Sequence, residues 1–347
     1  MNYVKAMMSA SVAALLLNAP GALAQQPESI TVAWYGGNWG EAFQACVATP
    51  FTEKTGIKVV PEIGTSTTTL SKLQQQSAAP TIDVAYLDGG ISELADKAGV
   101  LAAIDLAKLP NSANLSKAAA YRNGDKVYAV SGGYYSLGLT YNTKEITEAP
   151  TSWEALWDKD HAGAVTIPSP SNSGGVPFVF FVNQMLGGTS ADLSPAFKKL
   201  KELDAGLYFD SSGAASNAFQ SGEVAIGAHF NVGAWALADA GAPIGFVVPK
   251  EGVWATDARL HMVNGSKKAD AAAQFVDTAL SADSALCLAK RLYLGPAVTN
   301  VELTPEISRK LPWGEKGSVS DLKLFDWNEV NAKRAQITET WNREIAR

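Results

Sequence analysis

The segment from Ile30 to Leu109 alternates short apolar runs with helical patterns, and this alternation restricts the fold more than any other feature of the chain. The apolar runs, which we interpret as strands, are Ile30–Trp34, Ile57–Ile63 and Asp83–Leu87. Stretches with helical spacing follow them, at Glu41–Thr55, Leu70–Ala78 and Ile91–Ala98. A strand–helix repeat of this kind predicts an α/β protein with a parallel, doubly wound sheet. Ligands of such sheets bind beyond the carboxyl ends of the strands, so the loops there are the first candidates for a site.

The N-terminus has the three parts of a secretory signal peptide. Lys5 is its positive residue, Ala6–Leu17 is its apolar region, and Ala22-Leu23-Ala24 is a cleavage site of small residues. We therefore expect residues 1–24 to be removed and the mature chain to begin near Gln25, outside the cytoplasm.

Composition narrows the class of protein further. The 347 residues include 28 Lys and Arg against 34 Asp and Glu, a formal net charge of −6, which disfavours nucleic acid as a partner. The length exceeds the usual size of a single core and predicts two lobes. His161, His229 and His261 are scattered and form no metal-ligand pattern with the two distant cysteines. We expect no metal and no cofactor.

Two extended segments have no helix attached and are candidates for crossings between the lobes, Tyr128–Tyr141 and Ile244–Val248. Cys46 and Cys287 are the only cysteines. In an exported chain they form either one disulfide or two buried free thiols, and both interpretations stay open at this point.

Motifs along nearly the whole mature chain resemble one family. They include TVAWYGGNW (31–39), IDVAYLDGGISELADKAGVL (82–101), SGEVAIGAHFNVGA (221–234) and GPAVTN (295–300). The chain is similar in these motifs to the periplasmic solute-binding proteins of bacterial ABC transporters, in the extracellular solute-binding family that includes the spermidine/putrescine-binding proteins.

The resemblance implies the two-lobed periplasmic-binding-protein fold. Each lobe is then a doubly wound sheet, and two crossing segments join the lobes around the ligand. Residues 25–131 and 252–300 would form the first lobe, residues 132–251 the second, and residues 301–347 C-terminal helices that pack on the lobes. Both cysteines would lie in one lobe, which makes their disulfide possible. The family also implies a periplasmic, monomeric, non-enzymatic protein that delivers a small-molecule solute to an ABC permease in the inner membrane.

Several residues of the first lobe and the first crossing are candidate ligand contacts. Trp34 and Tyr35 fall in the first pocket loop of the relatives, where aromatic rings stack on alkyl or cationic groups. The alternative for Trp34 is a place in the core. Asp88 ends the third strand and suits an ammonium group, or else caps the following helix. Tyr135 lies on the crossing, where neighbouring side chains face opposite ways.

The remaining candidates lie further along the chain. Phe230 occupies the position of a pocket aromatic in the relatives. Trp254 lies one residue before another such position, which Ala255 occupies here. Asp257 aligns with an amine-binding aspartate, and its alternative is a salt bridge with Arg259. Arg259 could instead bind a carboxylate of the ligand. Tyr293 precedes the GPAVTN motif.

The sequence departs from the polyamine binders at one place. Those relatives carry acidic residues after the strand that corresponds to Ala164–Ile167, whereas this chain has PSPSNSGG (168–175). Ser171, Asn172 and Ser173, with the backbone N–H groups of a helix start, suit a carboxylate or another anion. We therefore predict a small amine-containing or zwitterionic solute, amino-acid-like or short polyamine-like.

The alternatives are another ligand, ferric iron, or an enzymatic function. Ferric iron is bound by some relatives through adjacent tyrosines, and Tyr134-Tyr135 is such a pair, but no His or Glu partner accompanies it. An exported hydrolase would need an activated nucleophile, and the chain has no Gly-x-Ser-x-Gly motif.

Overall fold

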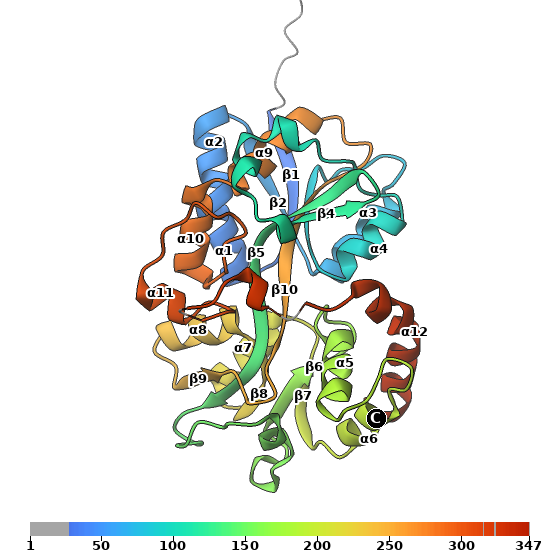
Figure 1. The fold of residues 1–347 in the computed structure, drawn as a ribbon, viewed down its shortest axis with the longest axis vertical. Coiled ribbons are helices and arrows are strands. Elements are labelled where there is room, and N and C mark those ends of the chain that lie inside the picture. Colours follow the sequence, from blue (N-terminus) through green and yellow to red (C-terminus); the bar gives the residue numbers. More distant parts are fainter. Residues whose placement is uncertain (1–27, 315, 323, 347) are drawn as a thin grey trace, which may run out of the picture.

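A computed structural model describes residues 28–314, 316–322 and 324–346, so the predicted signal peptide lies outside the described residues. The described chain forms two α/β lobes, one above the other in Figure 1. One mixed sheet runs through both lobes in the order β2-β1-β3-β10-β5-β8-β6-β7, with β4 and β9 paired to β5. Among the described helices, none is long and apolar enough to cross a membrane.

The first lobe contains the parallel strands β1, β2 and β3, as the strand–helix alternation predicts. Their bounds are Ser29–Trp34, Lys58–Ile63 and Val84–Asp88. The helices of this lobe are α1 (Asn38–Phe43), α2 (Thr49–Thr55), α3 (Ser66–Gln75), α4 (Ile91–Lys97), α9 (Ala269–Ala279) and α10 (Ala282–Leu292). A π-helical turn, Gln44–Ala48, joins α1 to α2. The Thr65 hydroxyl caps α3 in a capping box with Thr68, which fixes the start of this helix at the end of β2.

The second lobe contains the parallel strands β6, β7 and β8 and the edge strand β9. Their bounds are Val165–Pro168, Ala205–Phe209, Ile226–Phe230 and Ile244–Val247. Its helices are α5 (Gly175–Met185), α6 (Ser194–Lys201), α7 (Ser212–Ser221) and α8 (Asn231–Asp239). Short 3-10 helices elsewhere are Leu106–Lys108, Pro110–Asn114, Lys117–Ala119, Trp153–Trp157, Lys159–His161 and Val319–Asp321.

Two long strands join the lobes (Figure 1). The first is β5, Lys126–Asn142, which pairs with β4 (Ala120–Asn123) at one end and with β8 and β9 at the other. The second is β10, Trp254–Met262, which runs antiparallel to both β5 and β3. The prediction that Ile244–Val248 is the return crossing is therefore wrong. That segment is a partly buried edge strand, whereas every residue of β10 is buried. The sequence pattern indicates that Asp257–Asn264 is extended, but it does not indicate that this segment joins the lobes.

The two cysteines form a disulfide. Cys46 in the π-helical turn and Cys287 in α10 have Cα atoms 5.5 Å apart and are 241 residues apart in sequence. The Ser284 hydroxyl also donates a hydrogen bond of 2.9 Å to the Cys46 carbonyl oxygen. The free-thiol interpretation is excluded, and the bond ties α10 to the N-terminal helices of the same lobe.

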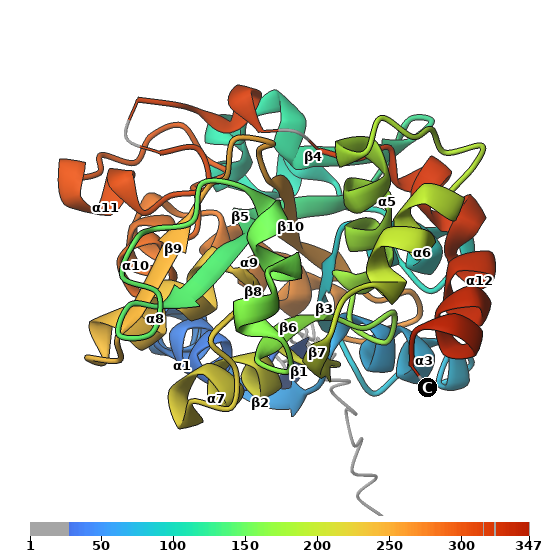
Figure 2. The same cartoon turned by 90° about the horizontal axis from the view of Figure 1, so that it is seen from below.

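The C-terminal segment packs on both lobes. After α11 (Pro305–Arg309) the chain reaches α12, Trp327–Glu344, whose start the Asp326 carboxylate caps. This helix contacts α5 and α6 of the second lobe, beside which it lies in Figure 2, and α4 of the first lobe. It therefore spans the junction next to the loop that follows β3.

Candidate functional site

A cavity of about 420 Å³ lies between the lobes, beyond the carboxyl ends of strands from both. Its first-lobe side comes from the loops after β1, β2 and β3, and its second-lobe side from those after β6, β7 and β8. The aromatic lining residues are Tyr35, Trp39, Tyr135 and Phe230. The polar lining residues include Asn38, Thr65, Ser66, Asp88, Asn172, Ser173, Ser211, Ser212, Ser216 and Asn217. This location is the one expected for a ligand site in parallel α/β sheets.

The four aromatic rings form a continuous wall. Tyr35 and Trp39 meet edge to face at 5.3 Å between ring centroids, Trp39 and Tyr135 at 5.1 Å, and Tyr135 and Phe230 at 5.2 Å. Edge-to-face packing holds each ring in place, and all four residues line the cavity. The wall joins the first lobe to the second through Tyr135 on the crossing strand β5.

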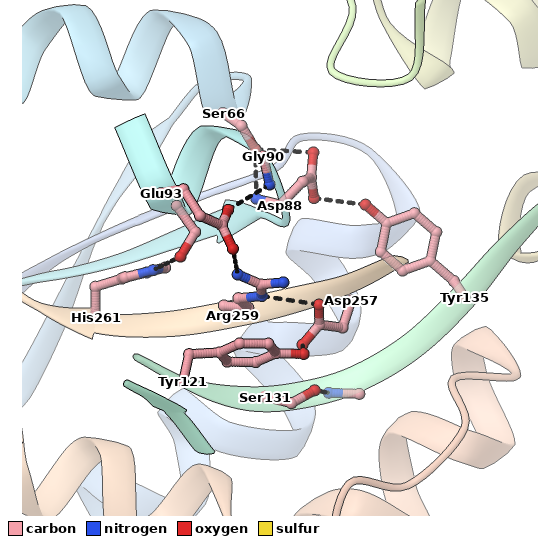
Figure 3. Close-up of polar contacts among 12 residues, drawn as sticks. Ser66, Asp88, Gly90, Glu93, Tyr121, Ser131, Tyr135, Asp257, Arg259 and His261 are labelled. Carbon is pink, nitrogen blue, oxygen red and sulfur yellow. Dashed lines mark hydrogen bonds and ion pairs between the residues drawn. The ribbon is translucent and has the colours of Figure 1, made fainter. Parts of the chain in front are cut away.

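Asp88 is the only charged side chain among the described residues that line the cavity. It ends β3, is 5% exposed, and accepts hydrogen bonds from the hydroxyls of Tyr35 and Tyr135 at 2.5 Å each. The Ser66 hydroxyl donates to it at 2.8 Å, as Figure 3 shows, and the Ser173 hydroxyl donates from the opposite lobe. The alternative that Asp88 caps α4 is wrong, because Gly90 is the N-cap residue of that helix.

Both tyrosines stay protonated donors over the physiological pH range. Burial, and next the neighbouring Asp88 carboxylate, raise the pKa of Tyr35 and that of Tyr135 well above the ordinary value of a tyrosine. Each hydroxyl therefore keeps its proton and its hydrogen bond to Asp88.

The two glycines after Asp88 are required by close packing. A Cβ atom on Gly89 would lie 2.6 Å from Trp327 Nε1 and 2.8 Å from Arg259 Nη2, and Gly90 has a φ of +89°. The Gly90 N–H donates to Glu93 Oε2 at 2.6 Å, and the Gly90 carbonyl accepts from Asn331 of α12 at 2.7 Å. These contacts fix the backbone that presents Asp88.

A charged cluster lies behind this loop (Figure 3). Arg259 on β10 is 1% exposed and pairs with Glu93 at 2.5 Å and with Asp257 at 2.9 Å. Its guanidinium carbon lies 3.4 Å from the ring centroid of Tyr121, whose hydroxyl donates to Asp257 at 2.7 Å. Burial raises the pKa of Asp257, although Arg259 opposes this. Asp257 is fully buried and does not line the cavity, so the structure favours its salt bridge over the predicted ligand contact.

Four further predicted contacts also lie outside the cavity lining. Trp34 is in the core against Phe43, because it and Tyr35 are neighbours in an extended segment and point to opposite faces. Trp254 is buried behind Phe230, at 6.1 Å between ring centroids. Tyr293 donates its hydroxyl to Asp239. Ser171 shares a hydrogen bond of 2.6 Å with the Ser169 hydroxyl.

In this structure the residues of PSPSNSGG, for which an anion site was predicted, make hydrogen bonds to other groups of the protein. The Asn172 side chain lines the cavity, but its oxygen accepts from the Gly174 N–H and its nitrogen donates to the Asp210 carbonyl. Ser173 donates to Asp88, and the Ser171 carbonyl accepts from Thr67 across the cavity at 3.2 Å. The stretch therefore closes the two lobes on each other.

Several lining residues were not predicted as contacts. Trp39 and Ser66 are two of them, and each follows the end of a strand. The largest omission is the start of α7 after β7, where Ser211, Ser212, Gly213, Ser216 and Asn217 line the cavity. Its signal was available, because a Ser- and Gly-rich loop that follows a strand and begins a helix is typical of a ligand loop.

Two buried histidines give the protein an acid-sensitive stability. Burial lowers the pKa of His229 to about 4 and that of His261 to about 3. Both take up protons on unfolding below the ordinary histidine pKa of about 6.5, so this part of the stability is complete above about pH 6.5 and is lost as the pH falls toward 4.

We expect chemical denaturation to give an unfolding free energy that falls by roughly 2 kcal/mol per pH unit near pH 5.5, because about two protons are taken up. Replacing His229 with Gln should reduce this slope by about half. An unchanged slope in that variant would show that the histidine is not responsible.

Comparisons with known proteins identify the family. The family described as bacterial extracellular solute-binding protein matches residues 47–312, and the chain belongs to it. A Haemophilus influenzae protein, spermidine/putrescine-binding periplasmic protein 1, is 26% identical over 325 residues, which cover 88% of this chain and 87% of that protein. The Escherichia coli K12 spermidine/putrescine-binding periplasmic protein is 25% identical over 226 residues, so the match spans 63% of this chain and 64% of that relative.

Solved structures show the same fold. The periplasmic binding protein MotA from A. tumefaciens B6, in complex with glucopine, has a TM-score of 0.78 at 18% identity and covers 91% of this chain and 99% of its own. The structure of the Atu4243-GABA receptor has a TM-score of 0.74 at 23% identity, over 90% of this chain and 96% of its own. The predicted two-lobed α/β architecture is confirmed.

Proposed function

We propose that this chain is the periplasmic substrate-binding component of an ABC importer that captures a small cationic or zwitterionic solute between its lobes. The observation that carries the proposal is a single buried carboxylate, Asp88, set against a wall of four aromatic rings. A carboxylate and ring faces together attract an ammonium group. The names of the curated relatives, which are spermidine- and putrescine-binding proteins, agree with an amine-derived ligand.

The cavity favours a solute with one positive end. A polyamine has several charged nitrogens, whereas Asp88 is the only carboxylate among the described lining residues. The second lobe brings the start of α7 to the cavity, with Ser212 and Gly213 in its lining, where helix N–H groups suit a carboxylate or hydroxyl oxygen. Asn38 Nδ2 is buried with no hydrogen-bond partner among the described residues and offers one more donor.

The contacts between the lobes support a mechanism of capture by closure. Ser173 donates to Asp88, and Thr67 donates to the Ser171 carbonyl, so each bond joins the first lobe to the second at the cavity. We propose that β5 and β10 act as the hinge, and that the closed form presents both lobes to an inner-membrane permease. The solute is bound without chemical change and released to the permease by a monomeric protein.

The structure gives no support to iron as the ligand. Tyr134 packs near Trp313, at 6.3 Å between ring centroids, whereas the next residue, Tyr135, faces the cavity. Adjacent residues of β5 thus point to opposite sides and do not form one ligand set. In the described residues no three His, Cys, Asp or Glu side chains are grouped as metal ligands.

The test is titration calorimetry of the mature protein, stripped of ligand by reversible unfolding, against matched solutes. The panel contains choline, glycine betaine, 4-aminobutyrate, putrescine, spermidine, glucose and a neutral carbon isostere of choline, 3,3-dimethylbutanol. We expect at least one singly charged cation or zwitterion to bind with the highest affinity and the neutral isostere to bind at least tenfold more weakly than choline. Preferential binding of spermidine or of a neutral solute would overturn the proposal.

A further inference from the structure

The hydrogen bonding of Asp88 limits what kind of cation can bind beside it. An ionised carboxylate has about four lone-pair positions for hydrogen bonds. Tyr35 and Tyr135 donate to one oxygen, and Ser66 and Ser173 donate to the other. In the closed form the protein's own hydroxyl groups therefore occupy the acceptor positions of this carboxylate, while its negative charge remains.

The donors on the first-lobe side are held in place. The Ser66 hydroxyl donates a hydrogen bond to the Asp88 carboxylate and accepts one from the Asp88 backbone N–H at 3.0 Å, so two hydrogen bonds hold it in place. The Tyr135 ring is packed edge to face between Trp39 and Phe230. The Tyr35 ring packs edge to face on Trp39 in the same way. Turning any of these hydroxyls away would disturb a buried hydrogen bond or the aromatic wall.

A primary ammonium group binds a carboxylate by donating N–H hydrogen bonds to it. At Asp88 it would have to displace a hydroxyl, and a buried hydroxyl left without its acceptor costs about 1–3 kcal/mol. A quaternary ammonium group has no N–H to donate, so it incurs no such cost. Its charge is attracted by the carboxylate and by aromatic faces within about 6 Å, which the wall of Tyr35, Trp39, Tyr135 and Phe230 provides.

We infer that the site selects a fully N-substituted ammonium group over a primary amine on the same carbon skeleton. This inference rests on the proposed function and defines the chemical class of its solute. The ammonium group of the solute is recognised through the charge of Asp88 and through contact with the aromatic rings, without a direct hydrogen bond to Asp88. The opposite end of the solute is free to be a hydroxyl or a carboxylate.

The test compares three pairs of solutes by titration calorimetry: choline with ethanolamine, glycine betaine with glycine, and 4-(trimethylammonio)butyrate with 4-aminobutyrate. In each pair that binds, we expect the quaternary member to bind at least about tenfold more tightly. A primary amine that binds as tightly as its quaternary partner would overturn the inference and leave the proposed function intact. If none of the quaternary members binds, the inference is also wrong. The proposed function is then overturned only if none of the other cationic or zwitterionic solutes of the panel binds either.

A matched pair of variants tests the mechanism. Tyr135→Phe keeps the ring in the wall but removes one hydroxyl donor, which frees an acceptor position on Asp88. We expect the quaternary-to-primary affinity ratio to fall by about tenfold, mainly because the primary amine binds better. Tyr134→Phe, at the neighbouring residue that faces away from the cavity, should leave the ratio unchanged. Equal ratios in both variants and the wild type would show that saturation of Asp88 does not set the preference.

Discussion

Replacing Asp88 with Asn should weaken the binding of a cationic solute by at least about 30-fold, because removing one partner of a buried charge pair costs roughly 2–5 kcal/mol. The side chain keeps nearly the same shape and retains an oxygen and a polar nitrogen for its hydroxyl neighbours. The loss should therefore appear in affinity for charged solutes and not in the fold. Titration calorimetry with choline and with its neutral isostere 3,3-dimethylbutanol separates the two effects.

The control for this variant is Asp192→Asn, which removes the same charge from an exposed loop away from the cavity. It should bind like the wild type. The Asp88 variant should lose affinity for choline only, so that the cation and the isostere come to bind about equally. A parallel loss for both solutes would mean that Asp88 shapes the cavity and does not recognise charge.

Replacing Arg259 with Met should destabilise the protein by roughly 3–5 kcal/mol, because Asp257 and Glu93 would then be left without their buried counter-charge. The free energy of unfolding, measured by chemical denaturation at pH 7, gives this loss directly. The effect should extend to binding, since Glu93 also accepts the Gly90 N–H and so holds the loop after Asp88.

An exposed ion pair provides the comparison. Lys72 pairs with Glu62, and their side chains are 45% and 37% exposed. Lys72→Met should cost less than about 1 kcal/mol. If Arg259→Met were as mild, the buried cluster would not be the element that fixes the loop, and its stabilising role would have to be abandoned.

The strands and their connections were largely predictable because they depend on local patterns. The first three strands carry apolar runs, and each is followed by a loop and a helix. β1 and β3 are largely buried, whereas β2 is an exposed edge strand. The return crossing was missed for a physical reason. β10 contains Asp257, Arg259 and His261, all fully or almost fully buried, and their partners Glu93, Tyr121 and Ala85 are distant in sequence. The local pattern predicts an extended segment at Asp257–Asn264, but it cannot show that the segment is buried and crosses between the lobes.

The site was predictable only in part, for a related reason. The position of Asp88 follows from the end of a strand, and alternation along β5 predicts that only one of Tyr134 and Tyr135 faces the cavity. Which of two neighbouring aromatics faces the cavity depends on register, so Trp34 and Tyr35 could not be separated from sequence alone. Asp257 and Arg259 are two residues apart on one strand and neutralise each other, and only the fold shows that this pair turns away from the cavity.

The measurement that tests the account most directly is a crystal structure of the mature protein with the tightest-binding solute of the panel. We predict that the cationic nitrogen lies in the cavity between the lobes, within about 6 Å of the ring centroids of the aromatic wall. Asp88 should keep its hydroxyl partners, and the other end of the solute should face Ser212 and Gly213. A solute bound outside this cavity, or one whose charged nitrogen points away from Asp88, would contradict the central claim.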